Sequence, residues 1–241
     1  MSQSINNKQI VIPGDVITKH VNSITGDSDV KLGPGLYHEA DEVKVCKPGV
    51  LRHKTPDTFW VDCHQKRYVP SKGDNVVGVV TSRQGDMYKV DIGASHLAVL
   101  NYMSFEGASK RNRPNVTNGD LIFGKLIVAN KDMEPEVSCV DPNNGKANGL
   151  GVLSDRGFSF HVPLNLARKL LSPSFTLIHE LGARITFEIT VGMNGRIFLS
   201  CNSPKFVILI MDVILSAEYL SNEQMEKLLI VLNVLLQNHP C

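Results

Sequence analysis

Short apolar runs separated by turn-forming residues dominate the sequence from Val11 to Val140. Glycine and proline favour turns, whereas Val, Ile and Thr favour extended strands. No window of this region sustains the apolar period of a helix, so it predicts an all-β structure in two modules. The turn-forming interruptions include Gly33-Pro34-Gly35, Lys47-Pro48-Gly49, Gly85-Asp86 and Arg113-Pro114-Asn115.

Gly-Asp pairs precede three of these apolar runs, at Gly14, Gly73 and Gly119. Glycine allows the turn and aspartate can bond the amide that follows, after which the β-branched residues extend the chain. We therefore predict that each pair starts a strand.

The sequence predicts two domain boundaries. Pro70 and Gly73 break the strand pattern in "YVPSKGD", and turn formers fill "DPNNGKANGLG" from Asp141 to Gly151. The predicted domains are residues 1–70, an N-terminal β domain, residues 71–150, a five-stranded OB-type barrel, and residues 151–241, an α+β domain. The whole is a multidomain protein.

The last third of the sequence mixes strand and helix patterns. "FSFHV" and "RITFEITV" read as strands, and "PLNLARKLL" reads as a helix that begins at Pro163. A second helix has Ser203 as N-cap, is apolar almost all round, and should therefore be buried. Ser221 and Gln224 form a capping box for a third, "SNEQMEKLLIVLNVLLQN".

Gly192-Met193-Asn194-Gly195 has the GXXG spelling of the loop with which KH domains clamp a nucleic-acid backbone. It lies between two extended runs, however, and not between two helices. Asn194-Gly195 favours a type I′ hairpin turn, with a positive φ at both residues. A KH clamp would fall near Leu166 to Phe175, where no glycine occurs, so we predict that residues 192–195 form a tight hairpin turn and not an RNA clamp.

The candidate RNA surface lies on the second module, because OB barrels bind single strands on one face and its loops. Lys110, Arg111 and Arg113 form a basic knot beside Ser109 and small residues, which lets a phosphate backbone approach closely. Tyr88 should join the core by strand alternation and Lys89 should face solvent. Tyr102 and Phe105 are the remaining aromatics that could stack on bases.

Composition sets broad limits. The net charge is +1, but Lys44 to Lys72 holds seven basic residues against Asp57 and Asp62, and this region is a further candidate surface for RNA or protein. The longest apolar run, Phe206 to Leu215, is interrupted by Asp212 and is shorter than the ~20 residues of a bilayer span. With no signal-like N-terminus, we expect no membrane association and a cytosolic or nuclear location.

Catalytic motifs are lacking in the sequence. No P-loop, HExxH or G-x-S-x-G occurs, and the cysteines form no CxxC pair, so no cofactor, zinc site or enzymatic activity is expected. Two acidic groups could in principle bind Mg²⁺, although solvation is their ordinary role in turn-like loops. They are Asp27 with Asp29, and Asp132 with Glu134 and Glu136.

The stretches "YVPSKGDNVVGVV", "LNYMSFEGASKRNRPNVTNGD" and "VGMNGRIF" occur in the order found in cap subunits of the eukaryotic RNA exosome. From "VIPGD" onward the chain resembles the member of this family that combines an N-terminal domain, an S1-type OB domain and a KH domain. In this family the GxNG turn is associated with packing between the S1-type and KH domains, so the resemblance implies that Gly192, Asn194 and Gly195 form a structural turn between domains.

The resemblance implies a non-catalytic, RNA-binding subunit of a hetero-oligomer. Such a subunit stabilises a ring of RNase PH-like proteins, meets other cap subunits, and guides single-stranded RNA to a 3′–5′ exoribonuclease for RNA processing and degradation. The implied location is the nucleus, nucleolus and cytoplasm. Many S1 domains carry aromatics where this chain has Asp86 and Lys89, and a histidine where it has Tyr102.

Those departures keep two alternatives open. The chain could be a purely structural clamp of a multisubunit complex with no direct RNA contact, or a metal-dependent nuclease that uses the acidic loops. The residues predicted to bind RNA are Ser109, Lys110, Arg111, Arg113, Lys89 and Tyr102.

Overall fold

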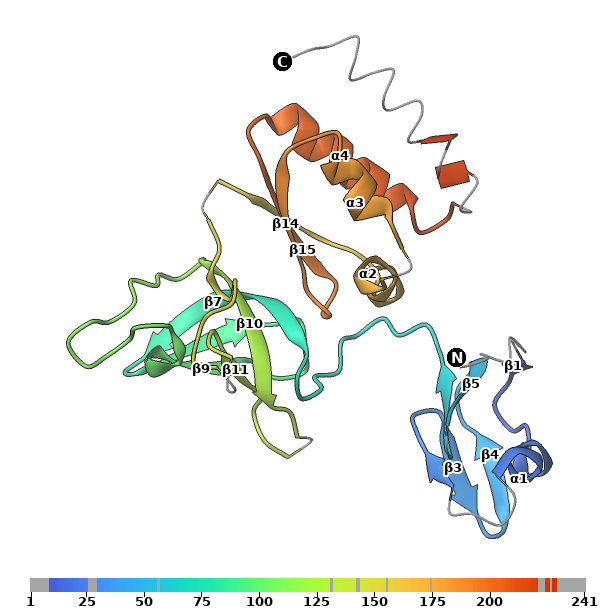
Figure 1. The fold of residues 1–241 in the computed structure, drawn as a ribbon. Coiled ribbons are helices and arrows are strands. Elements are labelled where there is room, and N and C mark those ends of the chain that lie inside the picture. The colour runs from blue at the N-terminus through green and yellow to red at the C-terminus, as the bar shows by residue number, and fades with distance from the viewer. Residues whose placement is uncertain are drawn as a thin grey trace. The chain divides into compact units, whose positions relative to one another are not determined.

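The chain folds into two units that adjoin in sequence at Gln65 and Lys66 (Figure 1). The computed structural model describes residues 9–25, 30–55, 57–130, 132–141, 144–154, 156–173, 175–220, 224–225 and 227–228.

The N-terminal unit is built on a small sheet with strand order β1-β5-β6-β2, in which β2 runs parallel to β6. A separate hairpin pairs β3 with β4. The core of the N-terminal unit includes Val11, Leu51 and Phe59, which are almost fully buried. The strands are β1 (Ile10–Val11), β2 (Lys31–Leu32), β3 (Leu36–Glu39), β4 (Glu42–Val45), β5 (Gly49–Lys54) and β6 (Thr58–Asp62).

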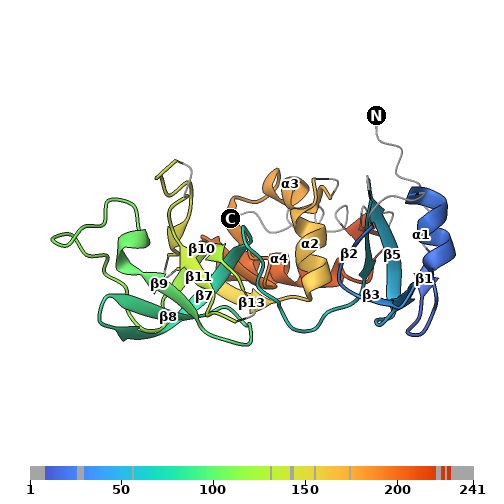
Figure 2. The same ribbon diagram turned by 90° about the horizontal axis from the view of Figure 1, so that it is seen from below.

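A helix in this unit corrects the all-β prediction. α1 (Thr18–Thr25) follows the first Gly-Asp pair, where a strand was expected. Ile17 and Val21 are buried one turn apart, and both ribbon views show α1 beside the strands of this unit (Figures 1 and 2). Two turns give only one apolar repeat, and β-branched residues favour strands, so the local pattern concealed the helix.

The second unit begins with a closed barrel, as the OB-type prediction requires. Its strands run in the order β11-β9-β8-β7-β10, and pairing of β10 with β11 closes it. The short β12 (Gly151–Val152) adds to β10. The five barrel strands are β7 (Asn75–Gln84), β8 (Met87–Asp91), β9 (Ala98–Asn101), β10 (Leu121–Val128) and β11 (Glu136–Ser138).

Strand alternation sorts the barrel residues as predicted. Tyr88, Val90 and Ile92 are buried in the barrel core, while Lys89 points to the other side of β8, where its side chain is mostly covered and does not face open solvent as expected. The second and third Gly-Asp pairs do precede strands, β7 and β10. The one-turn 3₁₀ helix η1 (Tyr102–Ser104) follows β9 and leads into the long loop that precedes β10.

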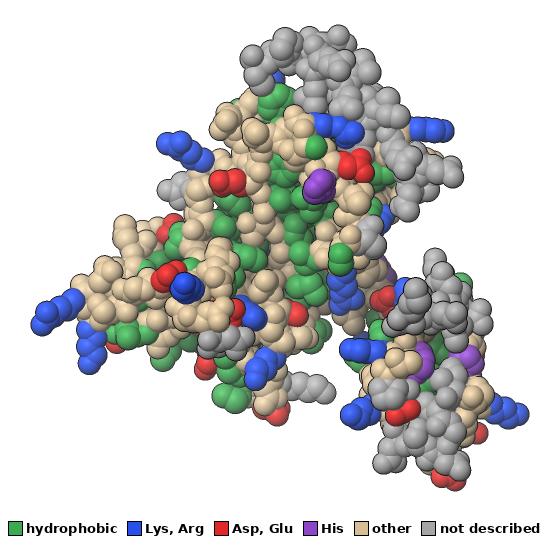
Figure 3. Space-filling model, in the orientation of Figure 1, with side chains coloured by type: hydrophobic (Ala, Val, Ile, Leu, Met, Phe, Trp, Pro, Cys, Tyr) green, Lys and Arg blue, Asp and Glu red, His purple; other side chains and the backbone are tan. Residues whose placement is uncertain are grey.

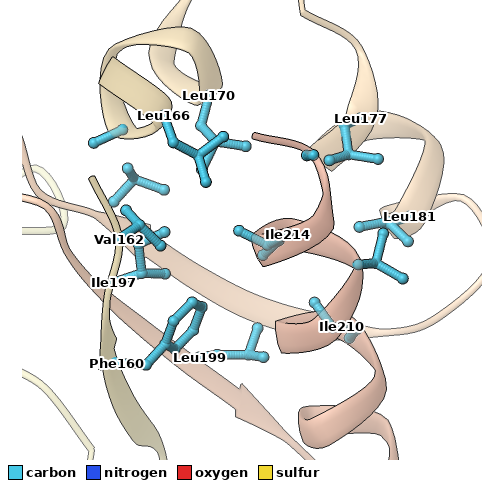
Figure 4. Close-up of a cluster of buried hydrophobic side chains, with 14 of the residues drawn as sticks. Phe160, Val162, Leu166, Leu170, Leu177, Leu181, Ile197, Leu199, Ile210 and Ile214 are labelled. Carbon is cyan, nitrogen blue, oxygen red and sulfur yellow. The ribbon is translucent and has the colours of Figure 1, made fainter. Parts of the chain in front are cut away.

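The rest of the second unit is the expected α+β region. Its strand order is β13-β15-β14, with both pairings antiparallel, and its helices pack their apolar side chains onto one face of this sheet (Figure 4). Pro163 directly precedes α2, and Ser203 is at the N-cap position of α4 as predicted, although the Ser203 side chain makes no capping hydrogen bond. The elements are β13 (Phe158–His161), α2 (Leu164–Leu171), α3 (Leu177–Gly182), β14 (Phe187–Val191), β15 (Arg196–Cys201) and α4 (Pro204–Ser216).

Two expectations about the last helices had different outcomes. α4 buries Ile210, Val213 and Ile214, but Ile208 is 56% exposed, so the prediction that this helix is buried all round is wrong. The helix predicted from Ser221 to Asn238 lies mostly outside the described residues. Among the residues that are described, no helix is both long and apolar enough to cross a bilayer.

The glycine pair lies in the predicted hairpin, between β14 and β15, but the turn type is different. Gly195 has a φ of +78°, whereas Asn194 is not among the residues with positive φ. The Gly195 amide donates to the Gly192 carbonyl, and the Gly192 amide to the Arg196 carbonyl. This is the pattern of a three-residue loop that ends in a left-handed glycine, so the type I′ prediction is wrong here.

Candidate nucleic-acid interface

The basic loop leaves the barrel from η1. Asn101, at the end of β9, accepts a hydrogen bond from the Met103 amide through its side chain, which caps η1. The Cys139 amide, just after β11, donates to the Ser104 carbonyl. The loop that follows therefore starts from a backbone fixed by two strands.

Hydrogen bonds within the loop give it a defined shape. The Ser109 amide donates to the Asn112 carbonyl at 2.9 Å, and the Ser109 hydroxyl accepts from the Asn112 amide at 3.0 Å. The Asn112 side chain also donates to the Gly107 carbonyl. Ser109 therefore uses its hydroxyl to close the loop, so that the side chains between Ser109 and Asn112 project from a turn.

Arg113 is turned back onto the barrel. Its guanidinium lies 3.1 Å from an Asp86 carboxylate oxygen and 4.9 Å from the ring centroid of Tyr102. Tyr102 is buried, with 6% of its surface exposed. Its ring consequently offers no free face for a base, and Arg113 has two partners before any RNA arrives.

Lys110 and Arg111 differ from Arg113. Both are exposed, and within the described residues neither side chain has an ion pair or hydrogen bond. Basic side chains project from the long loop at the left of the barrel (Figures 1 and 3). An exposed cation on a loop of fixed shape can neutralise a phosphate without first breaking another pair.

Lys89 is not such a cation. Its ammonium lies 2.6 Å from a Glu134 carboxylate oxygen, and only 18% of its side chain is exposed. A phosphate at Lys89 would have to displace Glu134. Lys89 therefore stands apart from Lys110 and Arg111, although the sequence placed all three in one set.

The other barrel aromatics are committed to packing. Tyr88 is 1% exposed, and Phe105 meets its ring edge-on, with centroids 6.5 Å apart. The described residues of the barrel thus present charge, and not an open aromatic platform, beside the basic loop.

The 192–195 turn contacts the barrel. The Asn194 side-chain amide donates to the carbonyls of Val77 at 2.8 Å and Ile92 at 2.9 Å, and its oxygen accepts from the Val77 amide at 3.3 Å. The Met193 amide donates to the Asn75 carbonyl. These bonds join the α+β region to β7 and to the end of β8.

Both glycines of the turn lack room for a side chain. A Cβ on Gly192 would lie 2.8 Å from the Val77 amide nitrogen, and one on Gly195 would lie 2.4 Å from the Val162 carbonyl oxygen. Real Cβ atoms do not approach so closely, so glycine is required for the turn to seat against its neighbours.

An ion pair that no sequence pattern predicted reinforces this contact. The Arg196 guanidinium, at the start of β15, donates to both the backbone carbonyl and the carboxylate of Asp91 on β8. Burial alone would raise the pKa of Asp91, but hydrogen bonds from Arg196 and the Gly93 amide hold it below its ordinary value. A charged residue at the start of the apolar run "RIFLS" was the available signal, because a buried charge needs a partner.

The connection between α2 and α3, where a KH clamp would lie, is occupied differently. It contains no glycine, and the Lys169 ammonium lies 4.7 Å from the ring centroid of Phe175. The clamp position therefore carries bulky side chains, as the sequence indicated.

All three modules of the chain match known protein families. Residues 68–151 match the family model for the S1 domain of exosome complex component RRP40. Residues 157–205 match a KH domain model, and residues 9–64 match the N-terminal model of mammalian exosome complex component RRP40. The human exosome complex component RRP40 is 47% identical over 83% of this chain and 74% of its own length. The chain belongs to the RRP40 family.

Other relatives support the assignment. Exosome complex component RRP40 of Drosophila melanogaster is 42% identical over 91% of this chain and 93% of its own length. The Saccharomyces cerevisiae protein is 36% identical over 79% and 81%. A crystal structure assigned to an exosome complex RNA-binding protein aligns with a TM-score of 0.55 and 25% identity, over 68% of this chain and 95% of that one.

Where the structure describes them, the acidic loops of this RRP40-family chain do not gather into a metal site. In the part of the chain that the structure describes, no group of three or more His, Cys, Asp or Glu residues could hold an ion. Glu134 is instead paired with Lys89. Asp27 and Asp29 lie outside the described residues.

The basic region from Lys44 to Lys72 spans both units of the chain and is partly neutralised. Lys44 pairs with Glu39 and Glu42, and Arg52 lies 3.5 Å from Asp62. The pKa of Lys44 is raised by its hydrogen bonds to the two glutamates. In the first unit of this RRP40-family chain, these cations are therefore already paired with acids of their own unit.

Proposed function

We propose that this chain is a non-catalytic RNA-binding cap subunit of an RNA exosome. In this role it stabilises the ring of RNase PH-like subunits, meets the other cap subunits, and guides single-stranded RNA to a 3′–5′ exoribonuclease. Membership of the RRP40 family supports the assembly. The absence of P-loop, HExxH and G-x-S-x-G motifs from the sequence is consistent with a subunit that catalyses nothing itself.

The observation that carries RNA contact is the state of Lys110 and Arg111. Both are exposed on a loop closed by Ser109 and Asn112, and within the described residues neither has a partner. The phosphates of single-stranded RNA can therefore pair with these two cations without first breaking an existing ion pair. Phosphate contacts of this kind steer a strand with little base specificity. Arg113 acts by holding the loop to Asp86 and Tyr102.

The alternative is a clamp that holds protein subunits together and never touches RNA. Burial of Tyr102 and pairing of Lys89 with Glu134 favour it, because both remove contacts that an S1 domain could offer to RNA. The RNA-binding function and the clamp differ in one measurable respect, which is whether RNA lies against the barrel in the assembly.

Crosslinking of RNA to the assembled complex separates the two functions. The RNA-binding function predicts adducts within residues 73–140, and it predicts that Lys110→Glu with Arg111→Glu reduces them. Lys205→Glu, at the exposed start of α4, is the matched control and should leave them unchanged. A complex that assembles normally but gives no adduct on the barrel would establish the clamp.

The cellular location proposed for this subunit is the nucleus, nucleolus and cytoplasm, since RNA processing and RNA degradation occur in those compartments. Fluorescent tagging of the full chain tests this proposal. Exclusion of the tagged chain from the nucleus would remove it.

A further inference from the structure

A second loop reaches the base of the basic loop. After β11 the chain runs through residues 139–150 before β12, and the Asp141 amide donates to the Lys146 carbonyl at 3.0 Å, which closes the loop on itself. The Lys125 ammonium lies 3.9 Å from the Asp141 carboxylate. The described part of this loop is thus anchored to the barrel at its beginning.

The loop is equally defined at its end. Asn148 and Gly149 have φ values of +48° and +83°, and the Leu150 amide donates to the Ala147 carbonyl at 2.8 Å. Two positive φ angles within such a bond are typical of a type I′ turn. Leu150 then packs against the barrel core, so the residues just before the turn have a fixed position.

One hydrogen bond joins the two loops. The Ala147 amide donates to a Glu106 carboxylate oxygen at 2.9 Å, although the residues are 41 positions apart. Glu106 stands four residues before Lys110 on the basic loop, and four extended residues span at most about 14 Å. Lys146, directly before Ala147, therefore lies beside Glu106, at the base of the loop that carries Lys110 and Arg111.

The charges on these two loops favour the binding of an anion. Asp86 is paired with Arg113, Asp141 faces Lys125, and Glu106 directs its carboxylate to the Ala147 amide. Lys146 is exposed, and among the described residues it has no ion pair. Lys110, Arg111 and Lys146 thus lie on two loops joined by a hydrogen bond, and Asp86, Asp141 and Glu106 each have a partner other than these three cations.

We propose that Lys146 is a third phosphate-binding cation of the RNA site, and that Glu106 is the residue that positions it. This deepens the proposed function, since it assumes that RNA binds at Lys110 and Arg111. The ligand is the phosphate backbone of a single strand that crosses both loops, which suits the roughly 4 to 16 nucleotides that one OB fold covers.

Lys146→Gln tests the cation directly. Binding of a fluorescein-labelled oligouridine strand to the full chain is followed by fluorescence anisotropy over a series of salt concentrations. Loss of one phosphate contact should weaken binding about threefold to tenfold at low salt and reduce the slope of log K against log salt by about 0.7. Lys205→Gln is the control, and equal affinities and slopes for Lys146→Gln and wild type would overturn the proposal.

Two substitutions of Glu106 separate positioning from charge. Glu106→Gln removes the negative charge but keeps an oxygen that can accept from Ala147, so affinity should stay level or rise. Glu106→Leu removes the charge and the hydrogen bond together, so affinity should fall below that of Glu106→Gln. Equal gains from both would show that Glu106 acts only as a charge and would overturn its positioning role.

A double-mutant cycle links the two residues. If Glu106 acts through Lys146, then in the Lys146→Gln background the Leu and Gln variants of Glu106 should bind RNA equally. A difference that persists in that background would contradict the link.

The failure of this proposal can be told from the failure of the proposed function. If Lys110→Glu with Arg111→Glu weakens RNA binding while Lys146→Gln does not, Lys146 is overturned and the RNA-binding function stands. If neither weakens it, both are overturned. If Lys146→Gln changes only the capture of protein subunits, the 144–150 loop is a protein contact and the RNA proposal for it is wrong.

Discussion

The side-chain amide of Asn194, on the turn between β14 and β15, both donates to the carbonyl and accepts from the amide of Val77 on β7. Asn194 is only 8% exposed, so these bonds form away from water. A single side chain thereby completes the backbone hydrogen bonding of the barrel where the KH-type region meets it. The S1-type and KH-type modules are joined at this turn by polar groups of fixed geometry.

Asn194→Ala should destabilise the second unit. It leaves the carbonyls of Val77 and Ile92 without their side-chain donor, and unsatisfied buried groups of this kind cost about 2 to 4 kcal/mol together. Urea unfolding of the full chain measures the loss. Asn118→Ala, at an exposed turn, should change the free energy of unfolding by less than about 0.5 kcal/mol, and a similar small effect at Asn194 would contradict the packing role.

Gly195→Ala should be more damaging than Gly85→Ala. Both glycines have positive φ, +78° and +60°, so both substitutions carry the cost of a left-handed alanine, about 1 to 2 kcal/mol. Only at Gly195 would the new Cβ also meet a backbone oxygen, that of Val162 at 2.4 Å, whereas Gly85 has nothing within 4 Å. Thermal unfolding of the two variants compares them, and equal melting temperatures would show that the turn has room to adjust.

The dipeptide Asn-Gly, which occurs at residues 148–149 and 194–195, shows what local sequence can and cannot predict. Asn-Gly predicts a type I′ turn, and Asn148-Gly149 has the paired positive φ angles of one. Asn194-Gly195 does not, because the Asn194 side chain is bonded to Val77 and Ile92 and the loop closes over three residues. The hairpin could be predicted from its flanking strands, but its form depends on a neighbour 117 positions away.

The candidate RNA site likewise has features that local sequence predicts and features that depend on the fold. Lys110, Arg111 and Arg113 could be found from composition, because a cluster of cations in a loop is visible in the sequence. That Arg113 is bound to Asp86 and Tyr102 could not, since the partner of a surface cation is chosen by the fold. Arg196 and Asp91 are 105 positions apart, and no local pattern pairs them.

Arg113→Lys should loosen the basic loop with little loss of stability. Lysine keeps the charge but cannot lay a planar guanidinium over Tyr102, and an exposed pair contributes at most about 1 kcal/mol. Hydrogen exchange of the Ser109 and Asn112 amides should become faster, while the free energy of unfolding barely changes. Arg168→Lys, exposed on α2, is the matched control. Unaltered exchange in Arg113→Lys would mean that the loop holds its shape without this anchor.

The contact between β8 and β15 should weaken in acid. The pKa of Asp91 is below its ordinary value of 3.8, owing to Arg196 and Gly93 in opposition to burial. A carboxylate with a lowered pKa in the folded state stabilises above its unfolded pKa, and the stabilisation is lost as pH falls through the folded value. The Asp91 contribution should therefore be complete above about pH 4 and be lost progressively as the pH falls below it through the folded pKa, and urea unfolding at a series of pH values measures this loss. Asp91→Asn should remove that part of the pH dependence, whereas an unchanged acid limb would contradict it.

The titration of His161, at the end of β13, provides a second measurement of the ion pair between Asp91 and Arg196. Its pKa is lowered below 6.5 by burial and then by the charge of Arg196, and the Asp91 carboxylate partly opposes this. The unfolded chain then binds more protons than the folded chain just below pH 6.5, so stability falls as pH drops through this window. In Asp91→Asn the opposing charge is gone, and the His161 midpoint followed by NMR should move still lower. Asp120→Asn, in a turn that bonds Thr117, should leave it in place. A midpoint that rises in Asp91→Asn would mean that the carboxylate does not act on His161 through space.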